Sequence, residues 1–336
     1  MDIAEYRQKI DTIDDELVSL ISQRKHLSEV LIQHKLQSNM PVFDAAREDA
    51  IIDRHIQHYA DVNPVLIEKL FHLLFANSKR QHYKNEHLSP IADYINRKPI
   101  IIAGPCVVES DTQIDAIATA LSAIGVKFLR GGTFKPRTSP TSFQGLGDEG
   151  VKLLATAAKK CNMYSVTEIL EAEQYARNSE YIDIVQIGSR SMTSYGLLKS
   201  IGKLTATDNK FVLLKRGFSA TINEFLLAAD YILQSGNSNV ILCLRGIRTF
   251  EQIDSSLRFT PDLASILELK EKNNLPVIFD PSHSSGNAKY IVPISNAALQ
   301  LGADGLLIES HCNPLNSLVD ASQAITPNEL LHIINL

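Results

Sequence analysis

Basic side chains recur at the ends of short apolar runs in the larger, C-terminal part of the chain. These residues are Arg130, Lys135, Arg137, Arg190, Lys215 and Arg245. A single such residue is most often a solvated surface charge. Six cations at one location would repel each other unless anions bound between them, and phosphates and carboxylates are suitable anions for arginine. Because basic residues recur at the ends of most of the apolar runs, the pattern favours an anion-binding site.

A second group combines a thiol, an imidazole and two carboxylates. Its members are Cys106, His283, Glu309 and Asp320. Such a mixed set suits a divalent ion, and Mn, Fe, Co and Zn all remain open. Taken singly, a cysteine of this kind is more often a buried core thiol and a histidine a satisfied polar residue. The metal interpretation therefore depends on a fold that brings the four residues together.

Eight short apolar runs supply that fold. They occupy residues 100–103, 127–129, 163–166, 184–187, 212–214, 240–244, 277–279 and 306–308. Helical patterns separate most of them, and the fourth run is the weakest because Gln186 interrupts it. This repetition predicts a (β/α)8 barrel, with a doubly wound open sheet as the alternative. In a barrel the strand ends meet at one face and the first strand lies beside the eighth, so both residue groups would gather there.

The N-terminal part has a helical period instead. Apolar residues recur at helical spacing over 3–36, and further helices are expected over 45–60 and 64–83. We therefore predict an all-α three-helix domain at 1–84, a linker at 85–98 and the barrel at 99–336. A first helix of about 50 Å needs a partner to cover its apolar stripe, so we expect a homodimer or homotetramer.

Composition excludes several classes of protein. The 336 residues carry 33 basic and 38 acidic groups, a net charge of −5, so no nucleic-acid partner is expected. The sequence contains no run of about 18 apolar residues, so no membrane helix is expected. The charged N-terminus is unlike a secretory signal. Four cysteines without a CxxC pair suit a reducing compartment. We expect a cytoplasmic enzyme that acts on small molecules.

The barrel half resembles 3-deoxy-D-arabino-heptulosonate 7-phosphate (DAHP) synthase, the first enzyme of the shikimate pathway, in its barrel-only subclass. The matching stretches are AGPCVVES, FLRGGTFKPRTSP, FQGLGDEG, VTEI, IGSR, LLKRGFSATI, RGIRTF, DPSHSSG and GADGLLIESH. They occur in the family's order over nearly all of residues 99–325. The resemblance implies condensation of phosphoenolpyruvate with erythrose 4-phosphate, with release of phosphate.

The resemblance also implies a role for each residue. The metal ligands match Cys106, His283, Glu309 and Asp320. The phosphoenolpyruvate contacts match Arg130, Lys135, Arg190, Lys215 and Arg245. The erythrose 4-phosphate contacts match Pro136, Arg137 and Thr138. The metal would polarise the aldehyde, the enol carbon would attack it, and water would add at the carbon that bears phosphate. Lys135 would bind the carboxylate and donate a proton, so that Lys135, Cys106 and His283 are the expected catalytic residues.

Three details bear on this resemblance. Leu244 stands where close relatives usually have Glu before Arg245, which removes an acidic neighbour. Cys312 is an extra thiol near the metal residues, and we expect it not to be a ligand. A sister enzyme, 3-deoxy-D-manno-octulosonate 8-phosphate synthase, usually has Asn in place of the Pro-Arg arrangement after the lysine. The stretch 135–138, KPRT, therefore favours the four-carbon sugar.

The N-terminal half resembles the all-helical class of chorismate mutase, through YRQKIDTIDDELVSLISQR, then Lys35, then PVFDAARED. The family's substrate-binding residues match Arg7, Arg24, Lys35, Asp44, Arg47, Glu48 and Ser78. The family's first arginine, here Arg7, reaches into the partner subunit's site. Chorismate rearrangement needs no nucleophile, only cations that hold two carboxylates and a donor to the breaking ether oxygen.

One departure concerns that donor. The family usually has Gln, and sometimes Glu, four residues after the position of Ser78, where this chain has His82. Gln81 lies one step early, about 100° around the helix. An imidazole with an ordinary pKa near 6.5 donates best when it is protonated. We therefore expect a mutase that is weak or favoured by lower pH.

Three functions remain open at this point. The first is a bifunctional enzyme whose helical domain also binds chorismate or prephenate as feedback ligands. The second is a synthase whose helical domain is only a binding and dimerisation module. The third is a metal aldolase on another sugar phosphate, which explains Cys106 and the array of cations less well.

Overall fold

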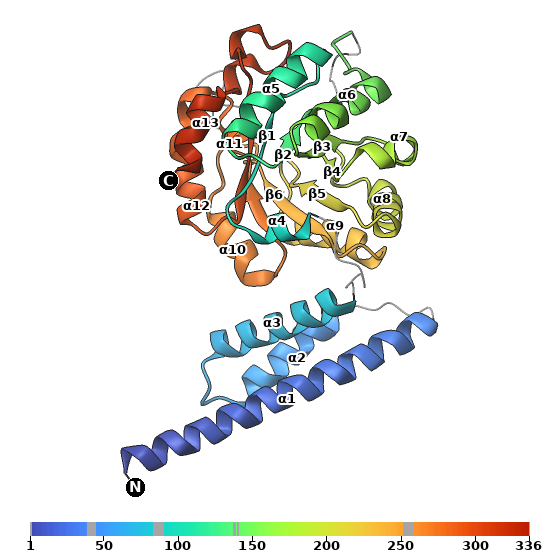
Figure 1. Ribbon diagram of the computed structural model, residues 1–336. Helices are drawn as coiled ribbons and strands as arrows, with labels where there is room; N and C mark the ends of the chain where they lie inside the picture. The colour runs from blue at the N-terminus through green and yellow to red at the C-terminus, as the bar shows by residue number, and fades with distance from the viewer. Residues whose placement is uncertain are drawn as a thin grey trace. The chain divides into compact units, whose positions relative to one another are not determined.

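The computed structural model describes residues 2–38, 45–82, 91–136, 139, 141–250 and 259–335. The chain divides into two compact units (Figure 1). One unit contains residues 1–84 with 271–274, and the other contains residues 85–270 and 275–336. No helix among the described residues is both long enough and apolar enough to cross a membrane.

The first unit consists of three helices: α1 (Ile3–Gln37), α2 (Ala45–His58) and α3 (Pro64–His82). Asp2 N donates to Glu5 Oε2 at 3.0 Å at the start of α1. Asn63 caps α3, because its Oδ1 accepts from Val65 N at 2.9 Å. Helix α3 packs against both α1 and α2. The three predicted helices are confirmed, with ends displaced by two residues or fewer.

Little apolar surface is buried within this unit. The buried apolar side chains of its described residues are Ile32, Ile52, Ile67 and Phe75. Large apolar residues along α1 remain exposed; they are Ile3, Tyr6, Ile10, Ile13, Leu17, Val18, Leu20, Leu27, Val30 and Leu31. One copy of the chain therefore leaves most of the apolar stripe of α1 in contact with water.

The second unit is a closed barrel of eight parallel strands. The strands are β1 (Ile100–Gly104), β2 (Phe128–Arg130), β3 (Tyr164–Glu168), β4 (Ile184–Ile187), β5 (Phe211–Lys215), β6 (Val240–Leu244), β7 (Val277–Phe279) and β8 (Gly305–Glu309). Strand β8 pairs with β1 in register from Ile100 opposite Gly305 to Gly104 opposite Glu309. This closure confirms the barrel and excludes the open sheet. At Gly305 a Cβ would lie 2.0 Å from Ile100 O, so the close pairing of these strands requires glycine.

Helices surround the strands (Figure 1). The longer ones are α5 (Asp111–Ala123), α6 (Gly147–Lys160), α7 (Ala172–Asn178), α8 (Tyr195–Thr207), α9 (Ile222–Gln234), α10 (Ala264–Lys272), α12 (Ile291–Gln300) and α13 (Pro327–Ile334). Shorter turns are α11 (Pro281–Ser285), η1 (Ser179–Tyr181), η2 (Ala288–Tyr290), η3 (Pro314–Asn316) and η4 (Ala321–Gln323). Of these, α11 follows β7, and η3 and η4 follow β8, so they shape the loops at the C-terminal ends of those strands.

The two ends of the barrel differ in chemistry. Helix α4 (Ala92–Asn96) packs at the N-terminal end, where Ile91 and Ile95 join an apolar core with Ile100, Ile102 and Phe128. The C-terminal end instead holds buried charged residues at the ends of β2, β5 and β8. The apolar plug therefore stabilises one end of the barrel, and the polar end is left for a binding site.

Candidate active site at the mouth of the barrel

A cavity of about 380 Å³ opens at the C-terminal ends of the strands. Five of the six predicted cations line it: Arg130, Lys135, Arg190, Lys215 and Arg245. Pro136, predicted to contact the sugar phosphate, also lines it, whereas Arg137 and Thr138 lie outside the described residues. The strand ends therefore bring the predicted anion-binding residues to one cavity.

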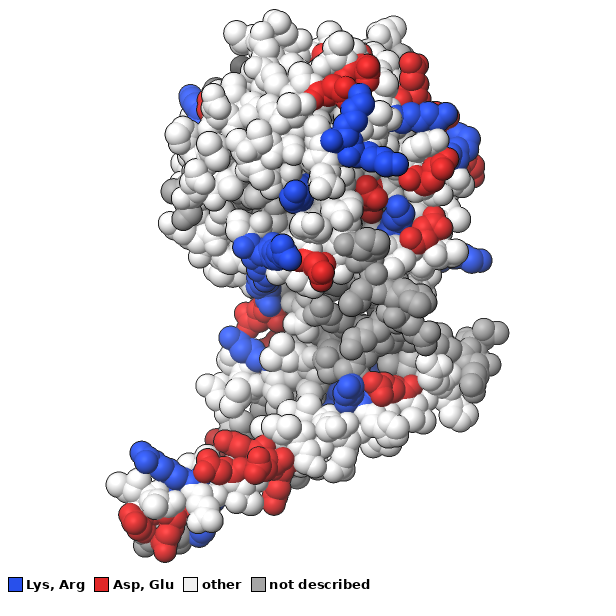
Figure 2. Space-filling model, viewed as in Figure 1, with Lys and Arg blue, Asp and Glu red and all other residues white. Residues whose placement is uncertain are grey.

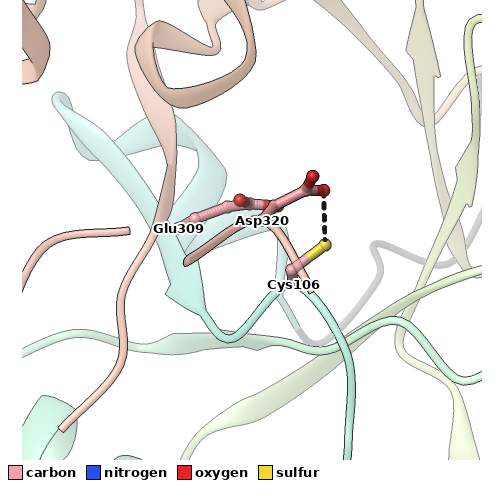
Figure 3. A group of neighbouring side chains, drawn as sticks. All are labelled: Cys106, Glu309 and Asp320. Atoms are coloured by element: carbon pink, nitrogen blue, oxygen red, sulfur yellow. Dashed lines mark hydrogen bonds between the residues drawn. The ribbon is translucent and has the colours of Figure 1, made fainter. Parts of the chain in front are cut away.

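Three of the four predicted metal ligands converge beside this cavity. The ligand atoms of Cys106, Glu309 and Asp320 all lie within 4.8 Å of one another (Figure 3). The Cys106 thiol donates to Asp320 Oδ2 at 3.1 Å. His283 lies beside this group, with Nε2 3.4 Å from Glu309 Oε1. The exposed Cys312 is not a member of the group.

The donor set fits a divalent transition metal. A thiolate together with an imidazole and carboxylates is typical of Mn, Fe, Co or Zn sites. His283 is oriented for ligation, because its Nδ1 lies 2.7 Å from Asp280 Oδ2 and its Nε2 faces Glu309. A carboxylate behind a histidine fixes the ring and makes the other nitrogen a better ligand. Asp280 was not among the predicted residues.

The protonation of Cys106 depends on this site. Burial, followed by the charge of Glu309, raises the pKa of the Cys106 thiol well above its ordinary value. Lys135 lies close by, with Nζ 3.2 Å from Cys106 Sγ. The thiol therefore keeps its proton when no cation is bound, and a metal ion would displace that proton.

Two of the predicted cations pair with buried carboxylates. Arg130 Nη1 donates to Glu309 Oε1 at 2.7 Å, and Lys215 Nζ donates to Asp280 Oδ2 at 2.6 Å. Burial would raise the pKa of Glu309, but neighbouring positive charges including Arg130 outweigh it and lower that pKa to about 2. Both carboxylates are therefore ionised, and they compensate the cations in the protein without substrate.

Aromatic rings hold the remaining arginines. The Arg245 guanidinium carbon lies 3.7 Å from the centroid of Phe259 and 5.0 Å from that of Phe218. Arg190 and Arg248 also lie over Phe218, at 5.3 and 5.0 Å. Cation–π contacts of this kind stabilise arginine without adding a negative charge. They account for the position of Arg245 in a chain that has the buried Leu244 instead of an acidic neighbour.

Sequence reasoning missed several residues of the cavity. Glu168 at the end of β3 and Gln186 in β4 both line it, and Gln186 Nε2 donates to Glu168 Oε2 at 3.1 Å. Gly188 makes room, since a Cβ there would lie 2.0 Å from Glu168 Oε1. The polar Gln186, which weakens the pattern of the fourth run, was the available signal. Arg248 and Phe218 gave none beyond the motifs that contain them, and Phe259 lies in none of the matching stretches.

The helical unit brings together fewer of its predicted residues. Arg24 Nη1 donates to Ser78 Oγ at 3.3 Å, and its guanidinium lies 5.4 Å from the ring centroid of Phe75. Burial lowers the pKa of Arg24, while the charge of Glu48 opposes that shift. Lys35 is half-buried and Arg47 is exposed. Asp44 lies outside the described residues, as does the side chain of His82 at the end of α3.

Arg7 is separated from this group. It is exposed on α1, seventeen residues before Arg24, which corresponds to about 25 Å along a helix. A side chain cannot reach across that distance, so Arg7 and Arg24 of one copy do not share a site.

Basic and acidic side chains are interspersed on the face of the chain shown in Figure 2, and its coloured residues form no extended basic patch there.

Family comparisons match both parts of the chain. Residues 84–335 match the DAHP synthetase I family, and residues 6–83 match chorismate mutase type II. A phospho-2-dehydro-3-deoxyheptonate aldolase of Thermotoga maritima is 48% identical over 225 residues, which cover 67% of this chain and 64% of that protein. A 2-dehydro-3-deoxyphosphooctonate aldolase of Fusobacterium nucleatum is 30% identical, over 70% of this chain and 88% of that protein.

Solved structures agree with the fold. The crystal structure of the T. maritima aldolase superposes with a TM-score of 0.66 at 46% identity, covering 70% of this chain and 67% of that one. A truncated form of the T. maritima synthase gives a TM-score of 0.63 at 41% identity, covering 70% and 83%. The chain belongs to the DAHP synthetase I family, and its residues 6–83 carry the match to chorismate mutase type II.

Proposed function

We propose that the chain is a bifunctional enzyme. Its barrel condenses phosphoenolpyruvate with erythrose 4-phosphate to DAHP and phosphate, with a divalent metal. Its helical domain converts chorismate to prephenate and senses these products. The observation that carries the proposal is the group of Cys106, Glu309 and Asp320 beside a cavity lined by five predicted cations. We propose domains at 1–84 and 99–336 with 85–98 as linker; the compact units divide between residues 84 and 85 and the family matches between 83 and 84, so both group residues 85–98 with the barrel.

The metal would be held by Cys106, His283, Glu309 and Asp320. When bound, it supplies Lewis-acid polarisation of the aldehyde oxygen. With Glu309 engaged as a metal ligand, Arg130, which pairs with it in this structure, would be free to bind a substrate anion. Arg190, Lys215 and Arg245 line the same cavity and hold the phosphate and carboxylate of phosphoenolpyruvate.

Proton transfers fall to two other residues. Burial would lower the pKa of Lys135, but the negative charges of neighbouring groups, among them Glu168 and Glu309, raise it, so Lys135 keeps a proton to donate. Glu168 is a cavity carboxylate outside the metal group, and Gln186 fixes one of its oxygens. We propose that Glu168 is the general base, which accepts a proton from the water that adds at the carbon bearing phosphate.

The four-carbon sugar is favoured over the five-carbon one. Lys135 and Pro136 line the cavity, and the KPRT stretch that contains them is the feature that separates the two classes in the sequence. The 30% identical octulosonate relative makes arabinose 5-phosphate the relevant competitor. The direct test uses protein stripped of metal with a chelator. Activity should be absent, should return with Mn²⁺, and should favour erythrose 4-phosphate; activity that ignores the chelator would contradict the metal proposal.

The helical domain presents Arg24 and Ser78 as an anchored pair for a carboxylate of chorismate. Its test is chorismate consumption by the full chain at acidic and neutral pH. Turnover that rises at acidic pH would support His82 as the donor to the ether oxygen. Absence of turnover, with chorismate or prephenate still slowing the barrel reaction, would support the alternative of a non-catalytic binding and dimerisation module.

A second copy of the chain is the proposed cover for α1. The exposed apolar residues of α1 are typical of an interface between copies. The separation of Arg7 from Arg24 fits a site to which each copy contributes one of the two arginines. We propose that two copies pair through this domain and that the assembly is a homodimer or a homotetramer. We further propose that the protein acts in the cytoplasm.

A further inference from the structure

Apart from the buried Val319, the segment just before Asp320 has little apolar packing. Asp320 has φ of +57°, a left-handed conformation that non-glycine residues rarely adopt without support. Before it, the side chains of Leu315 and Leu318 are 89% and 65% exposed. The position of this carboxylate must therefore be set by other contacts of the segment.

Glu109 provides the most direct of these contacts. Its Oε1 accepts a hydrogen bond from Leu318 N at 2.8 Å; Ser317 Oγ lies 3.4 Å from the same oxygen and donates to Val319 O at 2.8 Å. A carboxylate that accepts from a backbone N–H forms one of the stronger hydrogen bonds in proteins. Glu109 thus holds the chain two residues before Asp320.

Glu109 is itself fixed to the end of β1. Its backbone N donates to Gln113 Oε1 at 3.1 Å, and Gln113 Nε2 donates to Val107 O at 3.1 Å. Val107 in turn pairs with Gly132 beyond the end of β2. The carboxylate therefore projects from a rigid connection between β1 and α5.

The same connection carries Cys106, three residues before Glu109. Between the two ties, Val319 packs against Cys106 and Val107. The Cys106 thiol donates to Asp320 Oδ2 at 3.1 Å. Two short chain segments, 106–109 and 318–320, are thus joined at both ends. Cys106 contacts Asp320 at one end, and Glu109 contacts Leu318 at the other. These two contacts fix the separation of the two proposed ligands.

We infer that Glu109 is a positioning residue that sets the distance between Cys106 Sγ and the Asp320 carboxylate, and thereby the affinity for the metal. The inference rests on the proposed metal site. Groups that orient ligands without touching the ion commonly change metal affinity by about 10- to 100-fold when they are removed.

Length and charge of the side chain can be separated by substitution. In Glu109→Gln the amide oxygen still accepts from Leu318 N, but the charge is lost. In Glu109→Asp the charge remains, but the side chain is too short to reach. Glu109→Ala removes both. Glu224→Ala is the matched control, because Glu224 Oε2 accepts from Thr221 N at 2.7 Å at the start of α9, on the opposite side of the barrel.

The measurements are Mn²⁺ affinity, by titration of its electron paramagnetic resonance signal, and the thiolate-to-metal absorption band of the Co²⁺ form. We expect Glu109→Ala and Glu109→Asp to weaken Mn²⁺ binding about tenfold or more and to shift the Co²⁺ band. Glu109→Gln should stay within about threefold of the parent, and Glu224→Ala should match it. If Glu109→Ala does not fold, the comparison of Asp with Gln at this position decides.

Two results would overturn the inference alone. One is Glu109→Ala or Glu109→Asp with parental Mn²⁺ affinity and an unchanged Co²⁺ band. The other is a Glu109→Gln variant that binds Mn²⁺ as weakly as Glu109→Ala, while Glu109→Asp binds it with parental affinity. The charge of the side chain, rather than its length, would then determine the affinity. A parent chain that binds neither Mn²⁺ nor Co²⁺ would instead overturn the metal site, and this inference with it.

Discussion

The barrel mouth and the helical unit differ in how far the residues of their proposed sites are covered within one chain. In the mouth, Arg130, Lys215, Asp280 and Glu309 are each 5% exposed or less, and they form ion pairs within one chain. In the helical unit, the apolar residues of α1 are largely exposed, and Arg7 lies about 25 Å along the helix from Arg24. One chain therefore suffices to assemble the described residues of the barrel site, whereas we propose that a second copy completes the helical site.

The largest expected effect separates the two activities. Removing the thiol in Cys106→Ala should lower DAHP formation about 10³-fold, because a lost metal removes several kcal/mol of transition-state stabilisation. Chorismate consumption should stay at the parental rate. Cys161→Ala, at the end of α6, is the control and should retain both activities. A Cys106→Ala chain with more than a tenth of parental synthase activity would contradict the metal assignment.

The next effect tests how much the buried pairs contribute to stability. Arg130→Ala leaves Glu309 ionised without its partner, and breaking such a pair costs about 3–5 kcal/mol. The exposed pair of Arg177 with Asp148 provides the control, and Arg177→Ala should cost about 1 kcal/mol or less. The measurement is the free energy of unfolding of the barrel in urea. Equal losses for the two variants would mean that the mouth is as hydrated as the surface.

A smaller effect is expected on association. Ile10→Glu combined with Leu17→Glu places charges on the exposed stripe of α1, where each apolar side chain buried by a partner contributes about 1.5–3 kcal/mol. A loss of at least about 3 kcal/mol should weaken the dimer more than about 100-fold, as measured by sedimentation. Ser22→Glu lies on the other side of α1 and serves as the control. Unchanged association of the double variant would place the interface elsewhere.

The smallest effect concerns the N-terminal end of the barrel. Burial would raise the pKa of Asp304, but hydrogen bonds from Lys270 and Lys98, and from Val277 N, lower it below its ordinary value. A carboxyl whose pKa is depressed in the folded protein adds stability at pH values above its pKa in the unfolded chain, about 3.9. This stability is lost as the pH falls through the lower pKa of the folded state.

Asp304→Asn should therefore destabilise the barrel at pH 7 and flatten its loss of stability below about pH 4. Urea unfolding of metal-free protein at pH 7, 4 and 3 measures both changes. Parallel pH profiles for the parent and the variant would show that this carboxyl does not contribute.

Most of the barrel was predictable because strand ends in a closed barrel share one face. Arg130, Lys215 and Arg245 follow short apolar runs, and the closure of β8 on β1 brings Glu309 next to Cys106. The pairing of Arg130 with Glu309 was not predictable, because it joins residues 179 positions apart and depends on side-chain direction. The role of Glu109 was hidden for the same reason.

The helical unit was predictable as helices but not as a site. A period of 3.6 residues fixes which residues of α1 share a face, and it says nothing about what covers them. Arg24 and Ser78 meet because α3 packs against α1, a contact between distant parts of the sequence. For Arg7 we propose a role in the site of a second copy, which a helical period does not indicate.

The central claim is that the barrel site is complete in one chain and the helical site is shared between two. The most direct measurement follows DAHP formation and chorismate consumption in the same preparation of the Ile10→Glu, Leu17→Glu variant and of the parent, each over a dilution series. We predict that synthase activity per chain stays constant, while chorismate consumption is lost in the variant and falls with dilution in the parent. Loss of both activities together, or persistence of chorismate consumption in a monomeric variant, would contradict the account.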